Sequence, residues 1–117
     1  MKKNRVVVTG IGAVTPLGND AQTTWENIVN SKSGIDFTTR VDKDQFPVKV
    51  CGEVKDFDAT NFMDRKEVRR MDLFTQYAVA ASKMAVEDAN LVIDESNADR
   101  VGVWIGSGIG GMDVYEE

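Results

Sequence analysis

The chain of 117 residues contains no histidine, and it has only one cysteine and two prolines. Without imidazole, this chain alone cannot form a Ser-His-Asp triad, a Cys-His dyad or a histidine-ligated zinc site. Its single thiol, Cys51, excludes an internal disulfide and is typical of a reducing compartment. Cys51 lies in a predicted strand with no histidine or helix N-terminus to activate it, so we expect a packing residue. If the protein is an enzyme of one of these kinds, we expect its catalytic or zinc-binding residues to lie outside this chain.

Long apolar runs are also missing, and no window approaches the roughly 18 residues of a membrane helix. The start, MKKNRVVVTG, has too short an apolar run for a signal peptide. A formal net charge of −5 argues against nucleic acid as the main partner, because phosphate binding needs a surplus of Lys and Arg. We expect a cytoplasmic protein that binds neither nucleic acid nor membrane.

The composition is that of a globular protein, with 42% hydrophobic and 28% charged residues. A chain of this length fits one domain, and closing a core would bury somewhat over about 60% of its unfolded surface. Two short β-branched runs, 5–9 and 101–105, predict strands that are covered on both faces. We expect them to be parallel neighbours joined by a right-handed crossover in an α/β fold.

Helices and a peripheral hairpin are predicted between these two strands. Asn19 or Asp20 is a candidate N-cap for a helix over 20–30, closed by Gly34. Residues 35–47 predict an irregular excursion, and the alternation in 48–54 predicts a half-exposed strand of a hairpin. Further along, Asp64 and Glu67 form a capping-box pattern for a short helix, and Asp72 is expected to cap a longer one. The apolar stripe of that longer helix is rich in alanine and predicts close packing in a buried layer: Phe74, Ala78, Ala81 and Ala85. Two central strands alone leave unpaired edges, so the core sheet is incomplete and we expect the chain to be part of something larger.

Two glycine motifs follow the predicted strands. In the first, Gly10 and Gly12 precede Pro16, where a dinucleotide site would need a helix N-terminus. The second has the G-x-G-x-x-G spacing at Gly106, Gly108 and Gly111, but the acidic residue expected about 20 positions later has no counterpart. A dinucleotide-binding domain is therefore a disfavoured alternative.

A cluster of cations, which we call the basic cluster, lies in the short predicted helix: Arg65, Lys66, Arg69 and Arg70. With Glu67 between them the run 65–70 carries +3, so the rest of the chain carries −8. Like charges at i,i+4 cost a few tenths of a kcal/mol per pair on a helix. A solvated helix face and a docking site for an anionic partner are equally good readings of this pattern.

These segments together resemble the N-terminal portion of bacterial β-ketoacyl-[acyl-carrier-protein] synthase II, an elongating condensing enzyme of the thiolase-like family. The resemblance covers the whole chain in order and is carried by RVVVTGIGAVTPLGN, TTWENI, KSGI, DRKEVRRMDLFTQYA and DRVGVWIGSGIGG. It implies a layered α/β/α/β/α architecture, of which residues 1–117 form the first part of the N-terminal half. It also implies a homodimer, no cofactor, and acyl carrier protein with its acyl and malonyl thioesters as partner.

The implied reaction is a decarboxylative Claisen condensation that elongates a fatty acyl chain. In the family it uses a cysteine and two histidines, which match no position here, and Cys51 does not match the nucleophile. The resemblance places Gly108 and Ile109 beside the acyl channel, and Lys66, Arg69 and Arg70 against the acidic helix of the carrier protein. A non-catalytic relative such as a chain-length factor is the other alternative. We expect no condensing activity and marginal stability from these 117 residues alone.

Overall fold

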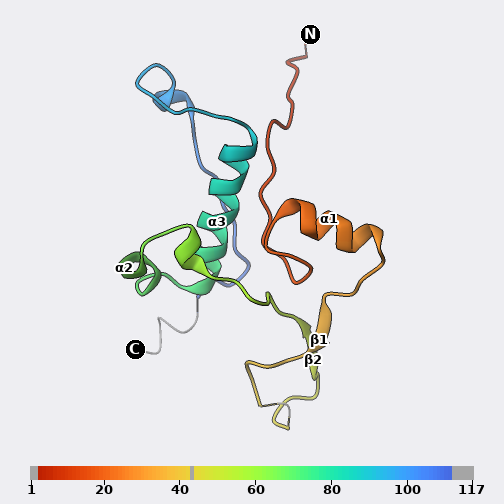
Figure 1. Cartoon of the computed structure of the whole chain (residues 1–117). Coiled ribbons are helices and arrows are strands. Elements are labelled where there is room, and N and C mark those ends of the chain that lie inside the picture. Colours follow the sequence, from red (N-terminus) through yellow and green to blue (C-terminus); the bar gives the residue numbers. More distant parts are fainter. Residues whose placement is uncertain (1–2, 43, 112–117) are drawn as a thin grey trace.

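The computed structural model describes residues 3–42 and 44–111. Its longest helix, α3, runs through the middle of the molecule, with the other elements around it (Figure 1). In chain order the elements are α1 (Ala21–Val29), β1 (Ile35–Phe37), β2 (Val50–Gly52), the 3₁₀ helix η1 (Ala59–Asn61), α2 (Arg65–Val68), α3 (Leu73–Asp88) and the 3₁₀ helix η2 (Ala98–Arg100). This is a small α/β assembly, as the sequence predicts.

The first helix, α1, confirms the predicted N-cap. The Asp20 carboxylate accepts a hydrogen bond from the Thr23 amide at 2.7 Å, which lowers the pKa of Asp20. The helix ends earlier than predicted, at Val29, and Ser31 then adopts a positive φ of 55°. The left-handed residue that closes this segment is therefore Ser31, and Gly34 instead lies against the ring of Pro16.

The predicted capping box is also confirmed, in α2. The Asp64 carboxylate accepts from the Glu67 amide at 3.0 Å, and the Glu67 carboxylate accepts from the Asp64 amide at 3.4 Å. Both acidic side chains thus bind backbone N–H groups at the start of the helix. In α3, Asp72 occupies the N-cap position but makes no side-chain cap hydrogen bond.

An antiparallel pair, β1 and β2, forms the peripheral hairpin, with Phe37 opposite Val50. Its second strand is shorter than the predicted 48–54, and its first strand falls in a segment that was predicted to be irregular. Glu53 stabilises the hairpin by accepting hydrogen bonds from the Thr38 and Thr39 hydroxyls at 2.8 and 2.7 Å. The Cys51 thiol, half-buried, donates to the same carboxylate at 3.5 Å, as suits a packing residue.

The two predicted core strands do not form. Segments 5–9 and 101–105 are extended, but neither pairs with the other in a ladder, so the predicted parallel neighbours are wrong for this structure. A strand depends on hydrogen bonds to a neighbour, and the only sheet among the described residues is the hairpin. The side chains of both segments are open to solvent, with Val6 90% and Trp104 98% exposed.

The open packing extends to the whole molecule. The radius of gyration is 17.4 Å, whereas a compact domain of this length has about 13 Å. The accessible surface is 10069 Å², between roughly 6,300 Å² for a compact protein and 18,700 Å² for the unfolded chain of this mass. The structure thus buries roughly 46% of the unfolded surface, less than the 60% or so expected of a chain that closes a core. The buried apolar residues among those described are Ala59, Met63 and Ala80.

Candidate functional site

The first glycine motif packs directly against α3. A Cβ built on Gly12 would lie 1.9 Å from the carbonyl oxygen of Ala81, and one built on Gly10 would lie 2.2 Å from that of Ala85. Alternate residues of the loop therefore face the alanine stripe of the helix with no room for a side chain. This confirms the close approach that the alanines predict, and it gives both glycines a packing role.

The residue between the two glycines fixes the loop to the same helix. The Ile11 amide donates a hydrogen bond of 2.8 Å to the carboxylate of Asp88, in the last turn of α3. A phosphate at this amide would meet a carboxylate and the C-terminal end of a helix, both of which repel anions. The geometry therefore gives no support to a dinucleotide site at the first motif.

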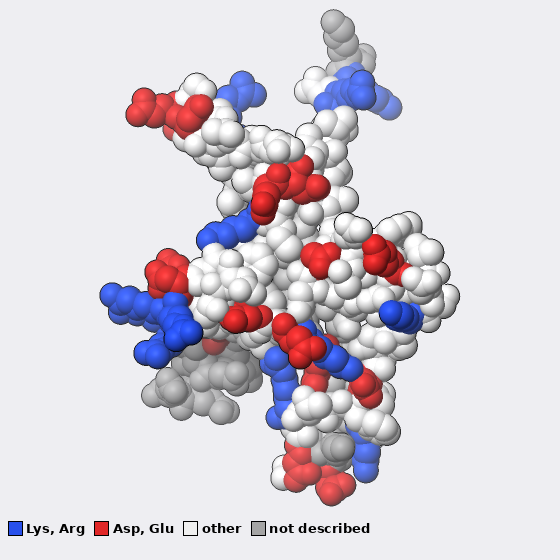
Figure 2. Space-filling view, in the orientation of Figure 1, with Lys and Arg blue, Asp and Glu red and all other residues white. Residues whose placement is uncertain are grey.

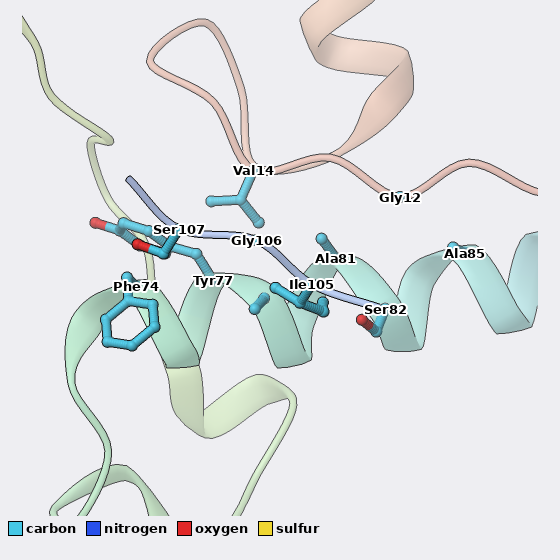
Figure 3. Close-up of a pocket in the computed structure, with 11 residues that line it drawn as sticks. Gly12, Val14, Phe74, Tyr77, Ala81, Ser82, Ala85, Ile105, Gly106 and Ser107 are labelled. Atoms are coloured by element: carbon cyan, nitrogen blue, oxygen red, sulfur yellow. The ribbon is translucent and has the colours of Figure 1, made fainter. Parts of the chain in front are cut away.

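A groove of about 470 Å³ opens where three segments meet (Figure 3). The N-terminal loop contributes Gly12 and Val14, and the segment after η2 contributes Ile105, Gly106 and Ser107. The α3 side is mostly apolar, with two hydroxyl groups: Phe74, Tyr77, Ala78, Ala81, Ser82 and Ala85. Such a lining suits an apolar ligand that makes few polar contacts.

The second glycine motif begins at this groove and continues beyond it. Gly110 adopts a positive φ of 83° and donates its amide to the Ser107 hydroxyl at 3.0 Å. Gly111 lies against Asp72, since its Cβ would be 1.5 Å from a carboxylate oxygen. A carboxylate at this point disfavours a pyrophosphate, so the second motif resembles a dinucleotide loop in spacing only.

The two predicted acyl-channel residues lie outside the lining of this groove. Ile109 is 83% exposed, and nothing lies within 4 Å of the position that a Cβ on Gly108 would occupy. They follow Ser107 directly along the chain, so the groove ends next to them. Their role stays a prediction.

The basic cluster forms an exposed surface on α2 and the turn that follows it. Figure 2 shows its side chains projecting from the edge of the molecule where α2 lies in Figure 1. The ion pairs in 3–42 and 44–111, Lys49 with Asp44 and Lys55 with Asp36, do not involve this cluster. The carboxylates of Asp64 and Glu67 cap the helix instead. The structure therefore brings Lys66, Arg69 and Arg70 together, as predicted, while their partner stays a prediction.

The base of α2 is held by residues that no motif indicates. The Gln76 side chain, from α3, donates its amide hydrogens to the carbonyl oxygens of Val68 and Met71 at 3.2 and 2.8 Å. Nearby, Phe57 stacks on Phe62 and meets Tyr77 edge to face. Sequence reasoning missed Gln76, as it missed Asp88, because a single polar residue on a helix carries no spacing signal.

The described residues contain neither a cluster of metal-ligating side chains nor a helix that could span a membrane. Nowhere in 3–42 or 44–111 do three or more Cys, Asp or Glu side chains lie close enough to hold a metal ion. Within the same ranges, no helix has the length and apolar character needed to cross a membrane.

Comparison with known families gives one match over nearly the whole chain. The sequence profile described as "Beta-ketoacyl synthase, N-terminal domain" matches residues 3–117. A 3-oxoacyl-[acyl-carrier-protein] synthase 2 of Staphylococcus aureus (strain COL) is 54% identical over 115 residues, which is 98% of this chain and 28% of the relative. A Synechocystis protein of the same name is 53% identical over 117 residues, again 28% of its length. The chain thus spans somewhat over a quarter of these relatives.

Solved structures give the same family of folds. The ishigamide ketosynthase/chain length factor superposes with a TM-score of 0.67 and 32% identity, over 74% of this chain and 21% of that chain. A second solved structure, AntDE:AntF, is a complex of a type II PKS acyl-carrier protein with its ketosynthase bound to the hexaketide. It superposes with a TM-score of 0.53 and 23% identity, over 86% of this chain and 23% of that one. At that identity the second likeness concerns the fold alone.

Proposed function

The chain belongs to the β-ketoacyl synthase N-terminal domain family, and from this premise we propose that it is part of a 3-oxoacyl-[acyl-carrier-protein] synthase. Residues 1–117 would form the first part of the N-terminal half of a thiolase-like condensing domain. The observation that carries the proposal is the 54% identity to a named synthase across 98% of the chain. The β-branched segments 5–9 and 101–105 support it, because they are exposed and unpaired here and the layered fold would pair them with further strands.

The whole enzyme would take an acyl chain from carrier protein onto a cysteine, as a thioester. Loss of CO₂ from malonyl-carrier protein leaves a carbanion, which attacks the carbonyl carbon of that thioester and expels the cysteine as a thiolate, and the product is a β-ketoacyl-carrier protein. The cysteine and the two histidines belong to other parts of the enzyme. This chain would supply binding surfaces, in an enzyme that we propose to be a cytoplasmic homodimer.

We propose that Lys66, Arg69 and Arg70 bind the acidic helix of acyl carrier protein. Three exposed cations without an ion partner among the described residues, in a chain of net charge −5, form a local positive field that would steer an anionic protein.

We also propose that Gly108 and Ile109 border the channel for the acyl chain. The apolar groove that ends beside them, lined by Ile105 and the alanine face of α3, supports this assignment. Glycines in the loop would let the backbone pass close to the substrate.

A condensation assay with the whole enzyme tests the proposed reaction. Acyl-carrier protein and malonyl-carrier protein should give an acyl chain that is two carbons longer. One CO₂ should be released for each product molecule. Failure to form the new carbon–carbon bond, together with a residue other than cysteine at the nucleophile position, would favour the chain-length-factor alternative. Saturable NAD(P) binding would favour the dinucleotide alternative.

A further inference from the structure

We propose that Gln76 is a positioning residue that fixes the orientation of the basic cluster toward its partner. This inference rests on the proposed docking of acyl carrier protein to α2. It adds a residue that lies outside the docking surface itself, on α3, and that acts through the backbone of the docking helix. Three features of the structure carry it.

The first feature is the geometry of the Gln76 carboxamide. Its Nε2 lies 3.2 Å from the carbonyl oxygen of Val68, the last residue of α2, and 2.8 Å from that of Met71, in the turn toward α3. The last carbonyls of a helix have no partner within the helix, so the next turn or a side chain must donate to them. The Val68 carbonyl accepts from the Met71 amide at 3.4 Å as well as from Gln76. One half-buried side chain of α3 thus donates a hydrogen bond to each end of the turn that carries Arg69 and Arg70.

The second feature is the small size of α2. A helix of four residues has almost no stability of its own, so its direction depends on what holds its two ends. The capping box of Asp64 and Glu67 closes the N-terminal end with local bonds. Gln76 is the contact at the other end that comes from a long helix. It therefore ties the direction of α2 to α3.

The third feature is the lack of other tethers on the cations themselves. Within residues 3–42 and 44–111, no ion pair holds Lys66, Arg69 or Arg70. Their ammonium and guanidinium groups thus take their positions from the backbone beneath them. If that backbone tilts, the charges move relative to the acyl groove, although no charge is lost.

Removal of the donor should therefore weaken docking and spare the chemistry. Gln76→Leu takes the side-chain donor from both carbonyls and leaves that of Val68 with the Met71 amide at 3.4 Å, and Gln76→Glu sets a carboxylate against them. The bond to the Met71 carbonyl has no substitute in Gln76→Leu, and losing one neutral hydrogen bond corresponds to roughly two- to tenfold in an equilibrium constant. We expect the KM for acyl-carrier protein to rise by about this factor in both variants, while kcat stays unchanged. The same acyl thioester on a small thiol, without the carrier protein, should keep its KM.

The test measures these constants in the whole enzyme, with two reference variants. Gln22→Leu makes the same change on α1, where the Gln22 side chain bonds to Glu26 of the same helix and to no other described residue, and it should leave both KM values unchanged. Reversal of charge at Lys66 and Arg69 tests the docking itself. In that background Gln76→Leu should add nothing, because a residue that acts through the cluster has no effect once the cluster is reversed.

Three results would overturn the inference. An equal rise in KM for carrier-bound and carrier-free thioesters would mean that Gln76 has a general structural role. An unchanged KM in Gln76→Leu, when charge reversal does raise it, would leave docking intact and remove the positioning role. If charge reversal itself has no effect, the docking proposal fails and the inference falls with it. Should Gln76→Leu not fold, Gln76→Met removes the same donor with a side chain of similar length.

Discussion

Gly12 lies so close to Ala81 that a Cβ on the glycine would be 1.9 Å from the alanine carbonyl oxygen. With Gly10 against Ala85, this contact joins the N-terminal loop to α3 and forms one wall of the groove. The loop and the helix are 69 residues apart in sequence at Gly12 and Ala81, so the contact is part of the tertiary fold. It also explains a glycine motif that has the appearance of a phosphate loop.

Gly12→Ala should force the loop away from α3. Overpacking of this kind costs about 1–3 kcal/mol. We expect reduced helicity at 222 nm and a lower urea midpoint in the 117-residue chain. Gly102→Ala provides the matched control, because nothing lies within 4 Å of the Cβ position there, and it should change neither quantity. Equal stability of the two variants would contradict the close contact.

Asp88→Ala should release the same loop by a different route. The Ile11 amide would lose its acceptor, so its hydrogen exchange should quicken, by about tenfold for the loss of one hydrogen bond to a charged group. Glu87→Ala removes the same charge one residue earlier, where no hydrogen bond of the carboxylate to the described residues is seen, and it should leave exchange at Ile11 unchanged. If both variants exchange at the original rate, Asp88 does not hold the loop.

Glu53 should give the hairpin a distinctive dependence on pH. Hydrogen bonds from two hydroxyls lower the pKa of Glu53 from its ordinary 4.5 to about 2, and the Thr39 hydroxyl has a larger effect than the Thr38 hydroxyl. Because the folded pKa lies below the unfolded one, the stabilisation is present above pH 4.5 and is lost as the pH falls toward 2.

Carboxyl carbon shifts of Glu53, followed by NMR during an acid titration, measure this directly. We expect a midpoint near pH 2 and, in Glu53→Gln, a smaller loss of stability between pH 4.5 and 2. A midpoint at the ordinary value would mean that the threonine hydroxyls do not bind the carboxylate in solution.

Ile109→Phe should shorten the acyl chains that the whole enzyme accepts, because a bulkier ring would fill part of the proposed channel. The readout is the distribution of product lengths from a mixture of acyl-carrier proteins. Ile93→Phe, in the link after α3, makes the same change away from the groove and should leave that distribution as it was. Unaltered chain-length preference in Ile109→Phe would remove the pocket assignment.

The sequence predicted those features that short-range chemistry determines. The N-cap Asp20 and the capping box of α2 depend on residues within a few positions of one another, and both are confirmed. The close approach at the alanines of α3 is confirmed too, but the buried layer predicted for their stripe is wrong for this structure, since Phe74 is 38% exposed. The two core strands failed for the opposite reason. Segments 5–9 and 101–105 have strand composition, but a strand also needs a neighbour, and the described residues provide none.

In the candidate site too, the sequence predicted the residues with a local pattern and missed those that the fold brings together. The cations of the basic cluster were found because charges four residues apart share a helix face. Gln76 and Asp88 were not, because each acts on a backbone group brought close only by the fold. The groove beside Ile105 was likewise not predicted, since its three segments are distant in sequence.

Exchange of charge across the proposed docking contact tests the central claim most directly. Lys66→Glu with Arg69→Glu in the whole enzyme should raise the KM for acyl carrier protein and weaken its salt dependence, whereas Lys32→Glu, beyond α1, should not. A carrier protein whose helix acids are replaced by lysine should then restore the KM of the reversed enzyme toward its original value. An unchanged KM on reversal, or no recovery with the exchanged carrier, would contradict the account.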